Sequence, residues 1–251
     1  IKAIFGPEHG FRGDKYDGEI IDDSVDPETG IPVISLYGDH KKPNPEDFTG
    51  IDLMVYDIQD VGARFYTYIS TMHYAMEACA ENNIPFVVLD RPNPNGHYVD
   101  GPVLDSAFRS FVGMHPIPMV YGMTSGEVAR MINGEGWLAN GVKCDLTVIR
   151  NNNYDHNSRY TLPVPPSPNL PNSRAISLYP SLCLFEPTVI SIGRGTSFPF
   201  QVVGYPDSTL GDFSFTPVSI DGVSKYPKHQ DVKCFGEDLR TEPTINGLDL
   251  N

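Results

Sequence analysis

The sequence predicts an α/β protein in which a Rossmann-like, mostly parallel sheet domain precedes a smaller, more β-rich α+β domain. Two observations carry this prediction. Apolar strand patterns alternate with helical patterns over roughly the first 150 residues, as in parallel sheets with helical crossovers. Beyond a proline-rich stretch, helical periodicity is weak, and short apolar runs alternate with turn residues instead.

Three apolar runs in the first ninety residues each end on acidic residues. The runs are Ile1–Phe5, Ile51–Val55 and Ile84–Leu89. Glu8 follows the first run, Asp57 and Asp60 follow the second, and Asp90 follows the third. If the runs are neighbouring parallel strands, these carboxylates line one edge of one sheet, where open α/β sheets bind ligands.

Two helices carry clear local signals. In Tyr66–Asn83, apolar side chains recur at helical spacing, and Asn82-Asn83 closes the segment before the third strand. A strand–helix–strand unit of this kind has parallel strands. Further along, Thr124-Ser125-Gly126-Glu127 has the pattern of a capping box, and Asn133-Gly134 ends the helix that it starts.

A domain boundary is expected near residues 150–160, giving domains over residues 1–155 and 156–251. Strand-like Cys144–Ile149 precedes it, and residues 163–171 hold five prolines in nine positions. Further short strands are predicted at four places. One is Ile31–Leu36 in the first domain, and the second domain holds Thr188–Ile192, Phe198–Val203 and Val218–Ile220. Because the chain opens inside an apolar run without Met, we expect both domains to be truncated at their outer ends.

Composition excludes several classes of protein. A net charge of −14 disfavours nucleic acid, whose binding proteins carry basic patches. No apolar run reaches the roughly 18 residues of a membrane span. The four cysteines form no CxxC pair, so buried free thiols are expected rather than a zinc site. Dinucleotide, P-loop, HExxH and GxSxG motifs are absent, and no cofactor is expected.

The sharpest candidate for chemistry is Glu8-His9. Pro7 and Gly10 predict a tight turn directly after a strand, which projects both side chains from the sheet edge. Glu8 suits a general acid or a nucleophile, and His9 could orient it or accept a proton. A solvated surface turn is the alternative interpretation.

The other two strand ends carry further candidates. Asp57 directly follows a buried-looking strand, whereas Asp60 could also be a helix cap, and Arg64 could pair with either or hold a substrate carboxylate. The third end supplies a rigid loop with Asp90, Arg91 and Asn93, whose alternative is a turn with a surface ion pair.

Candidate residues also occur at the start of the chain and in its second part. Arg12 lies beside the first acidic strand end, and Glu186 and Arg194 lie near residue 190. Arg194 stands between Gly193 and Gly195, an arrangement that lets a side chain reach a ligand without steric competition. Arginines would offset the acidic field for an anionic substrate.

Five long motifs resemble, in order, the exo-acting β-N-acetylmuramidases of bacterial cell-wall turnover, formerly a domain of unknown function. They are Gly6–Gly13, Tyr56–Thr67, Asp90–Pro94, Ser167–Pro171 and Cys183–Phe200. The resemblance implies a Rossmann-like amino-terminal domain, a smaller carboxy-terminal domain, and release of N-acetylmuramic acid from the non-reducing end of peptidoglycan fragments. Matched by position, it implies Glu8 as the catalytic carboxylate and an exported protein of the periplasm or cell envelope.

Glycoside hydrolysis needs an acid that protonates the leaving oxygen and a second carboxyl group. We therefore expect Glu8 as general acid, with Asp57 or Asp60 assisting and an arginine holding the lactyl carboxylate of N-acetylmuramic acid. Muropeptides are the expected partners. Two other functions remain open: a metal-dependent hydrolase or phosphotransfer enzyme on the same acidic edge, and a cell-wall sugar-binding module without turnover.

Overall fold

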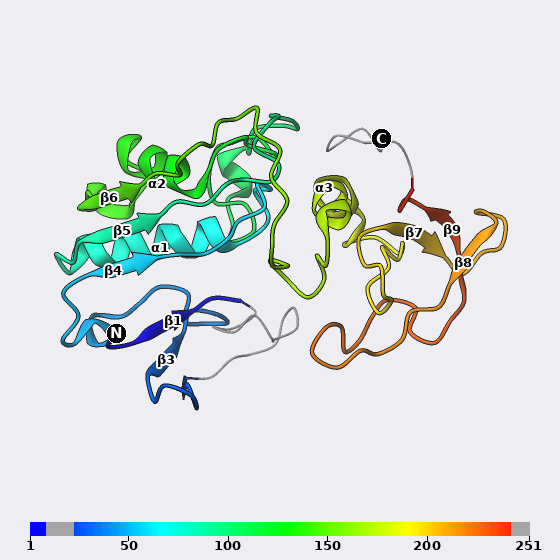
Figure 1. The fold of residues 1–251 in the computed structure, drawn as a ribbon, viewed down its shortest axis with the longest axis horizontal. Helices are drawn as coiled ribbons and strands as arrows, with labels where there is room; N and C mark the ends of the chain where they lie inside the picture. Colours follow the sequence, from blue (N-terminus) through cyan, green and yellow to red (C-terminus); the bar gives the residue numbers. More distant parts are fainter. Residues whose placement is uncertain (9–22, 242–251) are drawn as a thin grey trace. The chain divides into compact units, whose positions relative to one another are not determined.

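The computed structural model describes residues 1–8 and 23–241 (Figure 1). The chain forms two compact units. The first contains the described residues 1–8 and 23–160, and the second contains residues 161–241. Within the described part, no helix is both long enough and apolar enough to cross a membrane.

The first unit is built around a parallel three-stranded sheet with strand order β4-β5-β6. Its strands are β4 (Met54–Tyr56), β5 (Phe86–Leu89) and β6 (Leu146–Ile149). Helix α1 (Tyr68–Glu81) connects β4 to β5, so the predicted strand–helix–strand unit with parallel strands is confirmed. Helix α2 (Ser125–Gly134) lies between β5 and β6 in the chain. The predicted strand at Cys144–Ile149 is confirmed as β6.

The first apolar run does not join this sheet. β1 (Ile4–Gly6) pairs in parallel with β3 (Pro32–Ser35), and β2 (Ser24–Val25) pairs antiparallel with β3. The prediction that all three acidic strand ends share one sheet is therefore wrong, because Ile4 to Gly6 find their hydrogen-bonding partners in Val33 to Ser35. The short strand expected at Ile31–Leu36 supplies that partner.

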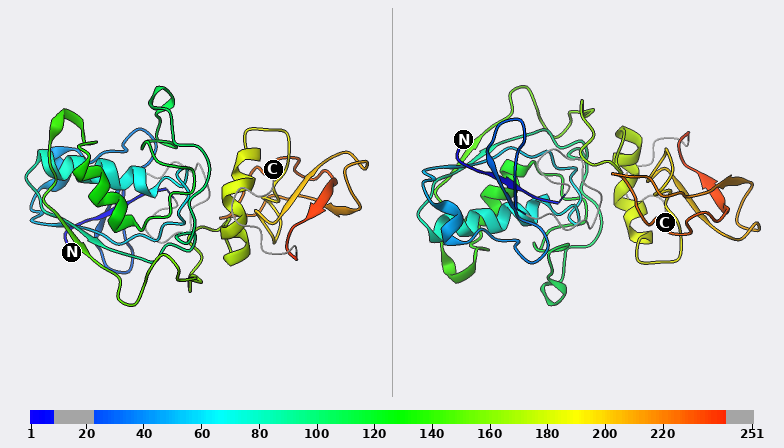
Figure 2. Two further views of the ribbon diagram at one scale, coloured as in Figure 1. Left: turned by 90° about the horizontal axis from the view of Figure 1, so that it is seen from above. Right: turned by 90° about the horizontal axis from the view of Figure 1, so that it is seen from below.

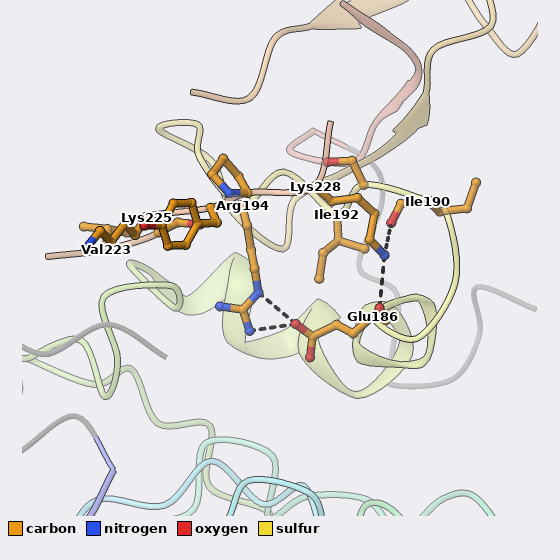
Figure 3. A pocket seen from close by; sticks show the side chains of 11 residues that line it. Glu186, Ile190, Ile192, Arg194, Val223, Lys225 and Lys228 are labelled. Atoms are coloured by element: carbon orange, nitrogen blue, oxygen red, sulfur yellow. Dashed lines mark hydrogen bonds and ion pairs between the residues drawn. The ribbon is translucent and has the colours of Figure 1, made fainter. Parts of the chain in front are cut away.

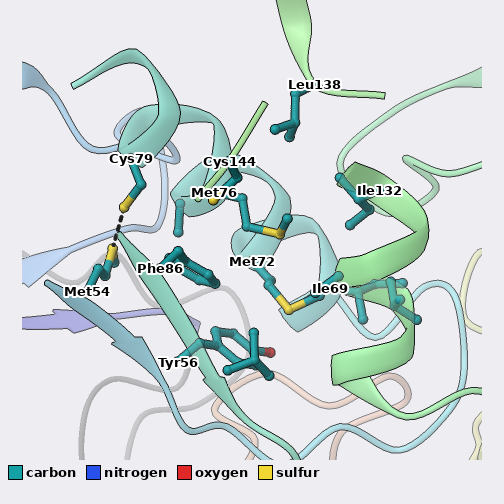
Figure 4. Packing of buried hydrophobic residues seen from close by; sticks show 14 of the residues in the cluster. Met54, Tyr56, Ile69, Met72, Met76, Cys79, Phe86, Ile132, Leu138 and Cys144 are labelled. Carbon is teal, nitrogen blue, oxygen red and sulfur yellow. Dashed lines mark hydrogen bonds between the residues drawn. The ribbon is translucent and has the colours of Figure 1, made fainter. Parts of the chain in front are cut away.

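The core of the first unit fills the space between the parallel sheet and its helices. Ile69, Met72, Met76 and Cys79 lie at helical spacing on α1, and all four are fully buried (Figure 4). They pack with side chains of β4, β5 and α2, and Figure 2 shows α1 in cyan beside α2 in green. The apolar stripe predicted from the sequence thus faces the sheet and packs α1 against β4 and β5.

The start of α2 confirms the capping box. The Thr124 hydroxyl accepts from the Glu127 backbone N–H at 3.3 Å, and the Glu127 carboxylate accepts from the Thr124 N–H at 2.8 Å. These reciprocal bonds satisfy two backbone donors that the first turn of a helix leaves unpaired.

The second unit combines one helix with an antiparallel sheet of order β7-β9-β8. Its elements are α3 (Ser173–Leu182), β7 (Val202–Tyr205), β8 (Phe213–Phe215) and β9 (Cys234–Asp238). Four 3-10 helices complete the described part: η1 (Pro45–Phe48), η2 (Ser106–Phe108), η3 (Ala139–Gly141) and η4 (Cys183–Phe185). Together the units form a mixed α/β protein with a parallel sheet and a separate β-rich part, as the sequence predicts.

Individual strands of the second unit differ from the prediction. Thr188–Ile192 is not a strand, since only Ser191 forms an isolated bridge, to Gly204. In Val218–Ile220, likewise, only Ile220 forms a bridge, and Phe198–Val203 overlaps β7 at its last two residues alone. Helix α3 was not predicted. All four cysteines are free, and three are buried, as expected.

Candidate active site

Glu8 lies two residues beyond β1, where hydroxyl groups from two other segments hold it. The Tyr37 hydroxyl donates to Glu8 Oε1 at 3.1 Å, and the Thr67 hydroxyl donates to Oε2 at 3.2 Å. The Tyr68 hydroxyl also donates to the Glu8 backbone carbonyl at 3.4 Å. Tyr37 follows β3, the partner of β1, and Thr67 is the N-cap residue of α1. The Glu8 side chain is partly exposed, so it is fixed in orientation yet reachable from solvent.

Asp60 is the buried carboxyl group of this region, with only 4% of the residue exposed. Its Oδ1 accepts from the Gly62 backbone N–H at 2.7 Å and from the Tyr121 hydroxyl. Its Oδ2 is buried and has no hydrogen-bond partner within the described residues. Burial raises the pKa of Asp60 to about 6, although the bonds from Tyr121 and Gly62 act in the opposite direction.

The ionisation of Tyr68 depends on both Glu8 and Asp60. Burial is the main cause that raises the Tyr68 pKa, and the negative charges of Glu8 and Asp60 raise it further. Both carboxylates therefore lie close enough to one phenol to oppose its ionisation. Glu8 and Asp60 lie in the same compact unit, although the strands that precede them belong to different sheets.

Asp57 and Arg91 lie apart from this buried group. Arg91 Nε donates to Asp57 Oδ1 at 2.7 Å, and both side chains are more than 40% exposed. An exposed pair of this kind contributes roughly 0–1 kcal/mol to stability. Of the two aspartates after β4, the one that sequence reasoning favoured less, Asp60, is the buried one.

The residues that follow β5 serve mainly to fix backbone. Asp90 accepts from the Thr124 hydroxyl at 2.7 Å and from the Gly126 N–H at 2.8 Å, so its carboxylate binds the start of α2. Asn93 is buried and donates to the Met123 carbonyl at 2.8 Å. A Cβ atom on Gly62 would lie 2.3 Å from Asn93 Oδ1, so Gly62 is required for this packing.

Arg64 also binds backbone. Its Nη1 donates to the carbonyls of Pro102, at 2.9 Å, and of Ile117, and burial lowers its pKa. These bonds fasten the segment between β5 and α2.

Glu186 and Arg194 form a close ion pair in the second unit (Figure 3). Arg194 Nε and Nη2 lie 2.8 and 2.7 Å from Glu186 Oε1, while Glu186 Oε2 accepts from the Cys183 thiol at 3.1 Å. Sequence reasoning selected both residues, and the structure brings them together. His9 and Arg12 lie outside the described residues.

Four tyrosine and threonine residues around the carboxylates were missed by sequence reasoning: Tyr37, Thr67, Tyr68 and Tyr121. Thr67 ends one of the long motifs, which was a usable signal. Tyr37 and Tyr121 lie far from their partners in the chain, and no local pattern marks them. In the described part, no cluster of three or more His, Cys, Asp or Glu side chains is arranged to hold a metal ion.

Comparisons with known proteins agree along the whole chain. The family model for the amino-terminal part of exo-beta-N-acetylmuramidase NamZ matches residues 1–174, and the model for its carboxy-terminal part matches residues 177–247. The peptidoglycan beta-N-acetylmuramidase NamZ of Bacillus subtilis (strain 168) is 45% identical over 254 residues, covering 95% of this chain. The chain spans 60% of the length of that relative.

Two solved structures of DUF1343 family proteins from Bacteroides fragilis NCTC 9343 share the fold. One is 50% identical with a TM-score of 0.89, covering 99% of this chain and 68% of its own. The other is 34% identical with a TM-score of 0.85, covering 100% and 67% respectively.

Proposed function

This chain belongs to the exo-beta-N-acetylmuramidase NamZ family, and we propose that it releases N-acetylmuramic acid from the non-reducing end of peptidoglycan fragments. The family match covers both units of the chain, and the observation that supports this activity best is the setting of Glu8. It is a partly exposed carboxyl group held between the Tyr37 and Thr67 hydroxyls, and the same unit contains a second, buried carboxyl group, Asp60.

In this proposal Glu8 is the general acid. Its proton passes to the glycosidic oxygen as the bond to the anomeric carbon breaks, and the oxygen of a water molecule bonds to that carbon. The proton that this water loses returns to the Glu8 carboxylate through solvent, which restores the acid. The two hydroxyl groups orient the carboxyl group toward the leaving oxygen, because they fix both of its oxygens from the side of the protein. Such positioning places the proton where the transition state needs it.

Asp60 supports the segment that carries one of the hydroxyls bonded to Glu8. Its oxygens are too deeply buried to meet a substrate, which excludes a direct role in proton transfer to the sugar. It accepts from Gly62 and Tyr121, so it fixes the backbone between β4 and Thr67, whose hydroxyl bonds to Glu8. Asp60 is therefore proposed as a positioning residue, and Asp57, exposed and paired with Arg91, is not assigned this role.

The proposed activity is tested with a defined disaccharide that carries N-acetylmuramic acid at its non-reducing end. We expect stoichiometric release of N-acetylmuramic acid, detected by mass spectrometry, at a rate that EDTA leaves unchanged. Activity lost in EDTA and restored by Mg²⁺ or Mn²⁺ would indicate a metal-dependent hydrolase instead. Tight binding of the disaccharide without hydrolysis would indicate a sugar-binding module.

We also propose that the protein is exported. Peptidoglycan lies outside the cytoplasmic membrane, so a protein that acts on its fragments during wall turnover meets them most directly in the periplasm or cell envelope. Fractionation of the native producer tests this proposal. Recovery of the protein in the envelope or medium is expected, and recovery with cytoplasmic markers contradicts it.

A further inference from the structure

The second unit contains a pocket of about 460 Å³ that the proposed catalytic step does not use (Figure 3). Its walls come from two segments. Residues 186–194 contribute the Glu186–Arg194 ion pair, and residues 223–228 contribute Lys225, Tyr226 and Lys228. Its size suits one sugar ring or a group of similar bulk.

Positive charge predominates in this pocket. Its lining holds three cations, Arg194, Lys225 and Lys228, and one carboxylate, Glu186, which gives a formal charge of 3 − 1 = +2. The chain as a whole carries −14. A concave site of opposite sign to the rest of the molecule attracts anions, because the surrounding protein concentrates its field.

The cationic wall is rigid before any ligand arrives. The Arg194 guanidinium is 5.0 Å from the centroid of the Phe200 ring and bonded to Glu186. Gly193 and Gly195 both have positive φ, and a Cβ on Gly195 would lie 2.5 Å from the Val218 carbonyl oxygen, so this turn has one permitted shape. Lys228 Nζ donates to the carbonyls of Glu186, Thr188 and Ile190, which anchors one segment of the pocket to the other.

Tyr226 gives the pocket an exposed aromatic wall. The residue is 81% exposed, and its only ring contact recorded among the described residues is with Lys225, whose Nζ lies 5.5 Å from the ring centroid. A large aromatic side chain held outside the core beside a cationic pocket offers a flat apolar face with a polar rim. The C–H face of a pyranose ring fits such a surface.

We propose that this pocket binds a carboxylate-bearing saccharide, with Tyr226 stacking on the sugar ring and Lys225 with its neighbouring cations attracting the carboxylate. The inference rests on the proposed function, because N-acetylmuramic acid is a sugar whose lactyl group supplies such a carboxylate. It adds a recognition site in the second unit and names the residues that select the anionic sugar over its neutral counterpart.

The test measures binding of free N-acetylmuramic acid, which the chain has no bond to hydrolyse, by isothermal titration calorimetry. N-acetylglucosamine, which lacks the carboxylate, and an L-alanyl-D-isoglutamine dipeptide, which lacks the sugar, are the comparison ligands. We expect N-acetylmuramic acid to bind about tenfold more tightly than either. Tyr226→Ala and Lys225→Ala are each expected to weaken it about five- to tenfold, whereas Phe108→Ala, which removes an aromatic ring 76% exposed in the first unit, is not.

Equal affinity of the wild-type and Tyr226→Ala chains for N-acetylmuramic acid overturns the inference, as does equal affinity for the neutral sugar. Dipeptide binding as tight as that of the sugar also overturns it, because the pocket would then recognise a carboxylate without needing the sugar ring. Disaccharide hydrolysis is scored separately in the wild-type chain. If the wild-type chain hydrolyses the disaccharide and Tyr226→Ala binds N-acetylmuramic acid as tightly as wild type, only this inference is contradicted. If the wild-type chain does not hydrolyse the disaccharide, the proposed function is contradicted, whatever the pocket binds.

Discussion

Asp60 shows how a single buried carboxyl group can constrain the candidate site. Its Oδ1 is satisfied by Gly62 and Tyr121, but its Oδ2 is buried without a hydrogen-bond partner in the described part. Leaving a buried acceptor unpaired costs stability, so a function is the natural reason to retain the residue. The charge of Asp60 acts on Tyr68, whose hydroxyl donates to the Glu8 carbonyl, so this function belongs to the candidate site.

Asp60→Asn is expected to stabilise the protein at high pH. The folded-state pKa of about 6 lies above the ordinary value of 3.8, so folding favours the protonated form, and stability falls as the pH rises through this window. A shift of about two units corresponds to about 3 kcal/mol at pH 8. Urea unfolding should show Asp60→Asn more stable by up to that amount at pH 8, with the gain narrowing toward pH 5. Asp57→Asn, at an exposed carboxyl group, is the matched control, and an equal gain in both variants would contradict the assignment.

At the residue scale, the signals that the sequence offers are local, and the catalytic role of Glu8 stays a prediction. Glu8 could be selected because a strand, Pro7 and Gly10 surround it in the chain. The hydroxyls that hold it come from Tyr37 and Thr67, which lie 29 and 59 residues away, so the residues around Glu8 could not identify them. Asp57 was favoured over Asp60 because it directly follows the strand, but burial depends on packing that the spacing does not report.

At the scale of elements, α2 depends on Asp90, which the sequence places in a rigid loop after the third strand. Asp90 accepts from the Thr124 hydroxyl and the Gly126 N–H, and so it supports the first turn of α2 from the end of β5. These bonds tie the loop after β5 to the helix that follows it in the chain.

Asp90→Ala is expected to lower the free energy of unfolding by about 1–2 kcal/mol, since it leaves two donors at the helix start unpaired. We expect the KM for the disaccharide to change less than about twofold, because the carboxylate is already engaged by α2. Chemical denaturation and steady-state kinetics measure the two effects. Asp105→Ala removes an exposed cap from the 3-10 helix η2, and a loss below about 0.5 kcal/mol is expected there. A large rise in KM with unchanged stability would instead support direct sugar binding by Asp90.

The elements that were predicted correctly have signals within a few residues. The α1 stripe and the α2 capping box are of this kind. Helix α3 was missed because it carries Pro180 in its interior and follows a proline-rich stretch, although Asn172 caps it through the Ala175 N–H at 2.9 Å. The placement of β1 was wrong because strand pairing is decided by distant partners, here Val33 to Ser35.

At the scale of the whole molecule, two buried histidines lower the stability of the fold as the pH falls. His73 Nδ1 and His115 Nε2 lie 3.1 Å apart, and burial lowers their pKa values to about 4 and about 3. Glu77 opposes this shift for His73, and Arg109 adds to it for both rings. The folded state therefore binds fewer protons than the unfolded chain below pH 6.5, and stability falls as the pH falls.

The pair is expected to contribute at most about 2.8 kcal/mol of lost stability per pH unit between pH 6 and pH 4.5, from at most about 1.4 kcal/mol for each histidine. His115→Phe keeps a ring beside Trp137 and removes one titrating group, so it should halve this contribution. Urea unfolding at a series of pH values measures the slope. Asp60 acts with the opposite sign in this range, so the comparison between variant and parent is the informative quantity. An unchanged slope would contradict the role of the pair.

Glu8 is proposed to donate the proton that releases N-acetylmuramic acid, and the kcat/KM of Glu8→Gln on the defined disaccharide tests this role most directly. Glutamine keeps an acceptor oxygen and the shape of the side chain but cannot supply the proton. We therefore predict a loss of kcat/KM of about 10²- to 10⁴-fold, with the thermal unfolding temperature unchanged within a few degrees. Glu46→Gln, at an exposed position on η1, is expected to retain full activity. A kcat/KM of Glu8→Gln within a few-fold of that of the parent chain would contradict the role of Glu8 as the general acid.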